Sequence, residues 1–229
     1  MVQKFSERYQ GPANLPQRIP VFPLRGAILL PRATLPLNIF EPRYLQMVED
    51  VMSTSRVLGL VQPGGGDQDE SPAGRTVPLR RVGCAGRITG YQELDDGRLL
   101  VTLTGITRFA LVDEVPFAKP YRICTVAYDT FLGDFVAGAG ENEVDRQGLL
   151  KALKTYLEAR DLKADWPAVA KSSNEMLVNA LAVVSPFGPE EKQALLEAAD
   201  LKTRTEILVA LAEMELAANA GGGTGSTLQ

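Results

Sequence analysis

Short hydrophobic runs separated by turn residues fill the first 128 residues and predict a β-rich region. Prolines interrupt the runs at residues 19–24 and 34–40, and proline disfavours helix and pushes the preceding residue towards an extended conformation. Asp95, Asp96 and Gly97 predict a hairpin turn, since glycine tolerates positive φ. Gly105 interrupts the apolar run that follows this turn, and we expect it to supply a bend or a close backbone approach within the sheet. The expected strands are residues 19–24, 34–40, 57–61, 82–92, 98–104, 107–112 and 122–128.

Helical spacing of apolar residues appears twice along the chain. Within the β-rich region, Pro42 is suited to a first helical turn and is followed by apolar residues three and four apart. From about Val144 onwards the period is helical throughout. We expect one helix there, a second from Trp166 to about Val184, a third from Pro189, and a last helix capped by Asp200.

A β-rich part followed by a helical part indicates the α+β class. The predicted division is a flexible tail at residues 1–17, a β-rich subdomain at 18–128, a connection at 129–143, a helical bundle at 144–218 and a flexible tail at 219–229. Residues 63–76 are rich in Gly, Pro and acidic residues and predict a mobile polar loop.

The charge of the chain argues against nucleic acid as the main partner. The 229 residues have a net charge of −4, whereas phosphate binding needs clustered Lys and Arg. The distribution is uneven, however: residues 1–125 hold 15 Lys and Arg against 12 Asp and Glu, and residues 126–229 hold 9 against 16. The Arg-rich first half therefore keeps an RNA-binding alternative open, while the acidic second half disfavours it.

Several catalytic chemistries lack their residues. The chain has no histidine, which excludes Ser-His-Asp and Cys-His arrangements, and it has no Gly-Lys-Ser/Thr phosphate loop. Its two cysteines, Cys84 and Cys124, match no zinc spacing and lie in apolar runs, so we expect buried, reduced thiols. We read Lys171-Ser172-Ser173 as a solvated helix surface and not as a dyad. We predict no catalytic, cofactor-binding or metal-binding residue.

Two further absences bear on location. The first ten residues lack the apolar core of a signal peptide, and no stretch approaches 18 apolar residues. We therefore expect a cytoplasmic protein without membrane contact. Its oligomeric state is not predictable from the sequence.

Four groups of residues follow one another along the chain: Ile19–Arg25 with Leu29–Pro31 and Leu35–Leu37; Phe40–Tyr44 with Met47 and Val48; Val82–Ile88 with Asp96–Arg98 and Thr104–Phe109; and Glu191–Glu197 with Arg204. In this order and spacing they resemble the Lon protease amino-terminal, substrate-binding family over about residues 18–216. The second group looks like the stand-alone bacterial members and the Lon-like domain of cereblon more than the full-length protease. The resemblance implies a PUA-like pseudo-barrel followed by a helical bundle.

The resemblance also implies a non-catalytic, ATP-independent module that recognises unfolded or exposed hydrophobic polypeptide. Such a module can act as an adaptor to a Lon-type protease or a chaperone. Full-length Lon continues into nucleotide-binding and serine-lysine protease domains, for which this sequence shows no counterpart. Because PUA-like barrels elsewhere bind RNA, an RNA-binding or small-molecule-binding module is the alternative.

Proline-marked strand edges are the best candidate binding residues, because proline lacks a donor N–H and an extended peptide can add to an exposed edge. Leu24, Leu37, Phe40 and Ile88 also have a structural interpretation as core residues, and Glu41 with Arg43 as a helix cap and local ion pair. We predict peptide binding by Pro23, Leu24, Arg25, Pro31, Arg32, Pro36, Phe40, Arg43 and Tyr44.

Overall fold

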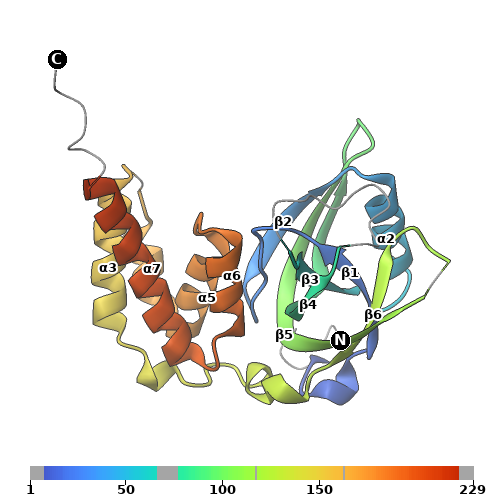
Figure 1. Ribbon diagram of the computed structural model, residues 1–229, viewed down its shortest axis with the longest axis horizontal. Helices are drawn as coiled ribbons and strands as arrows, with labels where there is room; N and C mark the ends of the chain where they lie inside the picture. The colour runs from blue at the N-terminus through green and yellow to red at the C-terminus, as the bar shows by residue number, and fades with distance from the viewer. Residues whose placement is uncertain (1–7, 66–76, 117, 162, 222–229) are drawn as a thin grey trace.

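The computed structural model describes residues 8–65, 77–116, 118–161 and 163–221, and shows a β-rich part packed beside a helical part (Figure 1). This is the predicted α+β order. Residues 219–221 of the predicted flexible tail belong to the last helix, so the prediction is wrong for them; residues 222–229 and most of the predicted polar loop lie outside the described residues. No helix within the described ranges is both long and apolar enough to span a bilayer.

Six strands form one mixed sheet, in the order β2-β5-β4-β3-β1-β6. Strand β6 pairs with β1 and also with β5, so five of the strands close into a barrel and β2 stays outside it. Among the six described strands, β1 and β3 are the one parallel pair. The strands are β1 (Arg18–Pro23), β2 (Thr34–Ile39), β3 (Val57–Pro63), β4 (Leu79–Glu93), β5 (Leu99–Val115) and β6 (Arg122–Ala127).

Strand β5 continues through Gly105, so the expected interruption is wrong, whereas the expected close backbone approach at this glycine is confirmed. The glycine is the point where another segment touches the strand. A Cβ atom at Gly105 would lie 2.0 Å from the carbonyl oxygen of Leu30. The amide of Gly105 donates to the carbonyl of Ala33, and the amide of Arg32 donates to the carbonyl of Gly105. Glycine is therefore required here by a close backbone approach.

The amino-terminal residues before β1 are packed and not a free tail. Tyr9 and Leu15 are buried against the barrel, and the amide of Val126 donates to the carbonyl of Gln17. The prediction of a flexible tail is wrong for residues 8–17, because two apolar side chains in this polar stretch pack against the core of the barrel. Residues 1–7 lie outside the described part.

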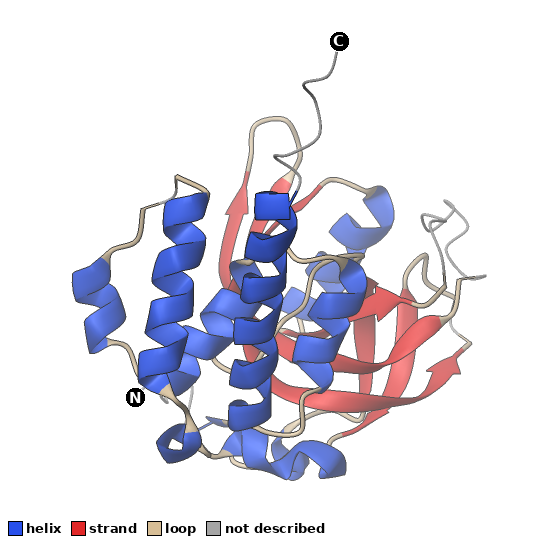
Figure 2. Ribbon diagram, turned by 60° about the vertical axis from the view of Figure 1, so that its left-hand side comes forward, coloured by secondary structure: helices blue, strands red, loops and turns tan. Residues whose placement is uncertain are grey.

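The helices lie together on one side of the sheet (Figure 2), apart from α2 (Pro42–Met52). Two 3-10 segments, η2 (Asp129–Phe135) and η3 (Glu141–Glu143), form the connection, and a third, η1 (Pro12–Asn14), precedes β1. The predicted long helix from Trp166 is two helices, because Ser173 caps a new start by accepting from the amide of Met176. The bundle contains α3 (Arg146–Ala159), α4 (Trp166–Lys171), α5 (Asn174–Val184), α6 (Pro189–Glu197) and α7 (Leu201–Gly221).

A buried ion pair joins the barrel to the bundle. Arg108 of β5 and Asp134 of η2 pair at 2.9 Å, with side chains only 5% and 9% exposed. The guanidinium of Arg108 also donates to the carbonyls of Leu196 and Ala198, at the end of α6. Cationic donors suit these carbonyls because a helix carries partial negative charge at its carboxyl end.

We expect the substitution Arg108→Met to destabilise the fold strongly. It leaves Asp134 buried without its partner, which costs about 3–5 kcal/mol in comparable cases. The matched control is Lys154→Gln on α3, which removes an exposed pair with Glu158 and should cost at most about 1 kcal/mol. Urea unfolding of both variants measures the difference, and equal losses would contradict this role for Arg108.

The two thiols should be unreactive in the native protein. Both cysteines are free and buried, and burial raises the pKa of the Cys84 thiol and raises that of Cys124 to about 11. Because the thiolate is the nucleophile, we expect little labelling by a thiol reagent at pH 8 until the chain is unfolded. Rapid labelling of native protein at either position would show that its strand is open to solvent.

Candidate functional site

The largest of the hollows described below is an open groove of about 620 Å³ at one end of the barrel. It lies between the end of β1 with the two residues after it, the part of β2 from Pro36 to Ile39, and the start of α2. Seven of the nine predicted binding residues line it: Pro23, Leu24, Arg25, Pro36, Phe40, Arg43 and Tyr44. The sequence reasoning missed Phe22, Leu37, Asn38, Ile39, Glu41 and Pro63. Pro63, which ends β3, carried the same proline signal as the residues that were found.

One long side of the groove is an unpaired strand edge. Among the described strands β2 pairs only with β5. The hydrogen bond from the amide of Gly105 to the carbonyl of Ala33 sets the alternation along this antiparallel pair. It follows that the backbone groups of Thr34, Pro36 and Asn38 point away from β5, towards the open side. Pro36 offers only its carbonyl there, whereas Thr34 and Asn38 each offer a backbone donor and a backbone acceptor.

The side chains of β2 divide between the core and the solvent. Leu37 and Ile39 are buried, while Thr34, Pro36 and Asn38 are exposed. This alternation follows from the two-residue period of a strand.

Phe40, directly after β2, is 63% exposed at the mouth of the groove. Its interpretation as a core residue is therefore wrong, whereas Leu37 and Ile88 are buried as predicted and Leu24 is half-buried. Proline at position 42 starts α2 so soon after β2 that Phe40 falls in the bend between the two elements. A large exposed aromatic side chain beside a groove is a typical contact residue.

The start of α2 contributes an aromatic and a charged side chain to the groove. Tyr44 is buried and its ring packs edge-on against Phe22, with centroids 4.3 Å apart. The guanidinium of Arg43 lies 4.5 Å from the centre of the Tyr44 ring and pairs with Glu41 at 2.9 Å. The local ion pair is thus confirmed. Glu41 occupies the N-cap position of α2, but its side chain makes no capping hydrogen bond.

Pro31 and Arg32 lie outside the groove. The chain turns back towards the bundle at Arg32, whose φ is 63°. Arg32 donates to the carboxylate of Glu175 and to the carbonyl of Asp134, and the carbonyl of Pro31 accepts from Asn179. Because these groups bind other parts of the chain, the two residues serve the interface between barrel and bundle.

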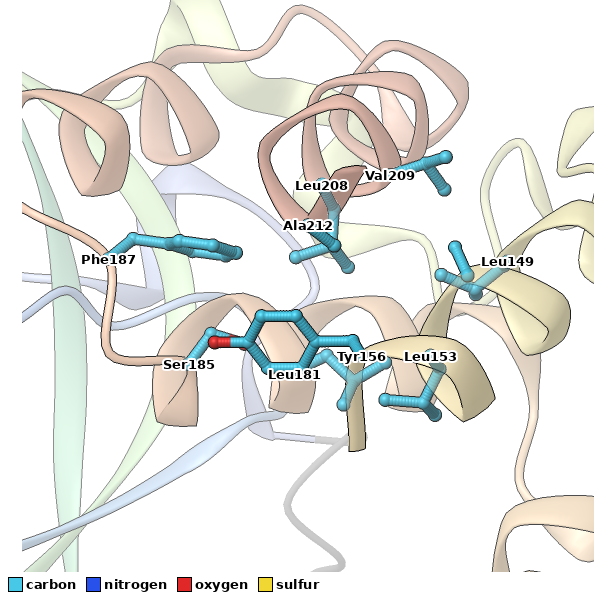
Figure 3. Close-up of a pocket in the computed structure, with 10 residues that line it drawn as sticks. Leu149, Leu153, Tyr156, Leu181, Ser185, Phe187, Leu208, Val209 and Ala212 are labelled. Carbon is cyan, nitrogen blue, oxygen red and sulfur yellow. The ribbon is translucent and has the colours of Figure 1, made fainter. Parts of the chain in front are cut away.

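Two smaller hollows lie in the bundle. The first, of about 20 Å³, is lined by apolar side chains of α3, α5 and α7 together with Phe187 (Figure 3). It has room for about one water molecule and not for a peptide side chain. The second, of about 320 Å³ between α3 and α7, is rimmed by Glu143, Asp145, Glu206 and Glu213 beside Lys202. No cluster of metal-ligating side chains occurs in the part of the chain that the structure covers. The groove is therefore the candidate site.

Comparison with known proteins points to one family. Residues 18–213 match the family model described as the ATP-dependent protease La (LON) substrate-binding domain. "Lon protease 2" of Myxococcus xanthus is 28% identical over 208 residues, covering 86% of this chain and 24% of that protein. "Lon protease" of Syntrophus aciditrophicus is 24% identical over 213 residues, covering 89% and 26%. The chain thus spans about a quarter of the length of these curated relatives.

Solved structures show the same fold. A Lon N-terminal domain protein from Xanthomonas campestris matches with a TM-score of 0.58 at 24% identity, covering 84% of this chain and 97% of that one. The N-terminal domain of Mycobacterium avium complex Lon protease matches with a TM-score of 0.60 at 15% identity, covering 86% and 98%.

The exposure of Phe40 gives a direct test of the groove's geometry. We expect Phe40→Ala to change the free energy of unfolding by no more than about 0.5 kcal/mol, as for other surface positions. Phe109→Ala, at a fully buried position of β5, should cost about 3–5 kcal/mol. Urea unfolding compares the two. A loss for Phe40→Ala as large as that for Phe109→Ala would place Phe40 in the core.

Proposed function

The chain belongs to the substrate-binding domain family of the ATP-dependent protease La (Lon), and on that premise we propose that its groove binds extended polypeptide. The observation that carries the proposal is the unpaired edge of β2 alongside an open groove of about 620 Å³. An unpaired edge can accept an extended peptide as an additional strand. Backbone hydrogen bonds of this kind bind any sequence, which suits the recognition of unfolded chains.

The side chains of the groove favour exposed hydrophobic segments. Phe22, Leu37 and Ile39 give the groove apolar walls, and Phe40 adds an exposed aromatic ring at its mouth. A peptide in extended conformation presents alternate side chains to such a surface. Pro36 has no backbone N–H, so a peptide added at this edge forms one hydrogen bond fewer. We therefore expect apolar contacts to supply much of the affinity.

We expect modest affinity with weak dependence on salt. Ordering a flexible peptide costs free energy, and a micromolar Kd, about −8 kcal/mol, is the expected range. Arg25 and Arg43 lie at the rim, where charged contacts contribute about 0–1 kcal/mol each. A steep fall of affinity with salt is instead the signature of phosphate binding.

The wider role follows from the family. We propose that the chain acts without catalysis, presenting unfolded cytoplasmic clients to a Lon-type protease or a chaperone. The match is confined to the substrate-binding family model, and we expect neither peptidase nor ATPase activity from this chain. The 24–26% coverage of the relatives leaves their protease activity as a property of those longer proteins.

Fluorescence anisotropy tests the groove with a labelled hydrophobic unfolded peptide and a polar scramble of equal charge. We expect the hydrophobic peptide to bind at least about tenfold more tightly, a difference of about 1.4 kcal/mol. Phe40→Ala should weaken its binding several-fold. Met214→Ala, which removes a side chain that is 67% exposed on α7, is the matched control and should have no effect.

Three outcomes would contradict the proposal. They are equal binding of both peptides, equal losses in the two variants, and no binding at high protein concentration. Tight binding of a structured RNA that is lost steeply between 50 and 200 mM salt would favour the RNA-binding alternative.

A further inference from the structure

We infer that helix α6 sets the position of the groove's β1-side wall through one buried amide, the side chain of Gln62. The inference rests on the proposed function only for the consequence in peptide binding. Gln62 lies near the end of β3 and is 2% exposed, and the next residue, Pro63, lines the groove. It acts as a positioning residue and does not itself line the groove.

On the groove side, Gln62 binds the segment that follows β1. Its Oε1 atom accepts from the amide of Gly26 at 2.8 Å. Leu24 and Arg25, the two residues before Gly26, line the groove, and the amide of Leu24 donates to the carbonyl of Val61 at 2.9 Å. Beyond the paired residues of β1, Leu24 is thus joined to β3 by a backbone hydrogen bond and Gly26 by a side-chain hydrogen bond.

On the bundle side, the same side chain binds α6. Its Nε2 atom donates to the carbonyl of Pro189 at 2.8 Å and to Oε1 of Gln193 at 3.1 Å. Gln193 is also buried, and its own Nε2 atom donates to the carbonyl of Val82 at 3.2 Å and to Glu197 at 2.6 Å. Gln193 is thus held by β4 and by its own helix, and it presents a fixed acceptor to Gln62.

These contacts leave the amide of Gln62 a single orientation. The backbone amide of Gly26 requires an acceptor and the carbonyl of Pro189 requires a donor, so the oxygen must face the groove and the nitrogen must face α6. An apolar side chain of similar size would leave both backbone groups without their partner, and an unpaired buried polar group is costly. A displacement of α6 is therefore transmitted to Gly26 and from there to Arg25.

The placement has a functional consequence. The groove belongs to the barrel, yet one of its walls is held by the first two turns of α6. Any partner that binds α6 and shifts it should change how tightly the groove holds a peptide. This gives the bundle a role in peptide binding although the described residues that line the groove all come from the barrel part.

The test is a double-mutant cycle in peptide affinity. We expect Gln62→Met to weaken binding of the hydrophobic peptide about five- to tenfold and Gln193→Met about two- to fivefold. In the Gln62→Met background, Gln193→Met should add nothing, because the two act through the same contact. The control is Arg80→Ala, which removes an exposed ion pair between β4 and Glu190 of α6 and should leave affinity unchanged. Thermal unfolding confirms that each variant is folded. If Gln193→Met does not fold, Gln193→Asn, whose side chain is one methylene shorter, replaces it in the cycle.

Amide hydrogen exchange gives a readout that does not depend on peptide. We expect faster exchange at Gly26 in Gln193→Met, with exchange along the β4–β5 pair unchanged. If wild-type protein binds no peptide but Gly26 still responds in this way, the proposed function fails and the link to α6 stands. Unchanged exchange at Gly26, or additive losses of affinity in the cycle, would overturn the inference.

Discussion

The burial of Arg108 is the constraint on which the arrangement of the two parts depends. A guanidinium removed from water is tolerated only when ionic and hydrogen-bond partners surround it. Here the partners come from two other elements: the carboxylate of Asp134 in the connection and the carbonyls of Leu196 and Ala198 at the end of α6. The ring of Phe131 covers the guanidinium at 4.5 Å. The barrel and bundle cannot separate at this point without exposing or stranding the charge.

A second buried arginine extends the same interface. Arg204 of α7 donates to the carbonyl of Leu195 and to Asn179 of α5, and Asn179 donates to the carbonyl of Pro31. The last carbonyls of α6 are thus shared between one arginine from the sheet and one from the bundle. Burial lowers the pKa of Arg204 to about 10, which still leaves it charged at neutral pH. The interface is therefore specified by directional polar contacts as well as by the apolar core around them.

The position of the groove depends on the interface between barrel and bundle. The segment between β1 and β2 passes between β5 and the bundle, and its backbone touches β5 at Gly105. The segment then enters β2, whose outer edge stays unpaired. Pro36 is compatible with two roles at that edge. It prevents full pairing with another copy of the chain, a known protection of exposed edges, and it leaves the backbone donors of Thr34 and Asn38 available to the extended peptide that we propose binds there.

The sequence by itself determined most of the local structure. The two-residue period and the prolines located the strands, the change of period located the helices, and Asp95–Gly97 gave the hairpin turn, because these signals arise within a few neighbouring residues. Seven of the nine predicted binding residues line one groove, because the end of β1, strand β2 and the start of α2 surround it. Their role in binding peptide stays a prediction.

Only the tertiary structure decided where those elements meet. Phe40 is a large apolar residue in a hydrophobic run and was expected in the core, but the short connection from β2 to α2 leaves it exposed. Arg32 and Arg25 both follow closely on a proline in the sequence and were both predicted to bind peptide. Arg32 nevertheless pairs with Glu175, 143 residues away in the sequence. Gln62 carried no local signal of its role, since a buried amide is defined by partners from distant segments. Gly105 indicated a bend or a close backbone approach, but the segment that approaches it, Leu30–Ala33, was visible only in the tertiary structure. Patterns along a chain report which face is apolar, whereas the identity of the group opposite that face depends on how the whole chain packs.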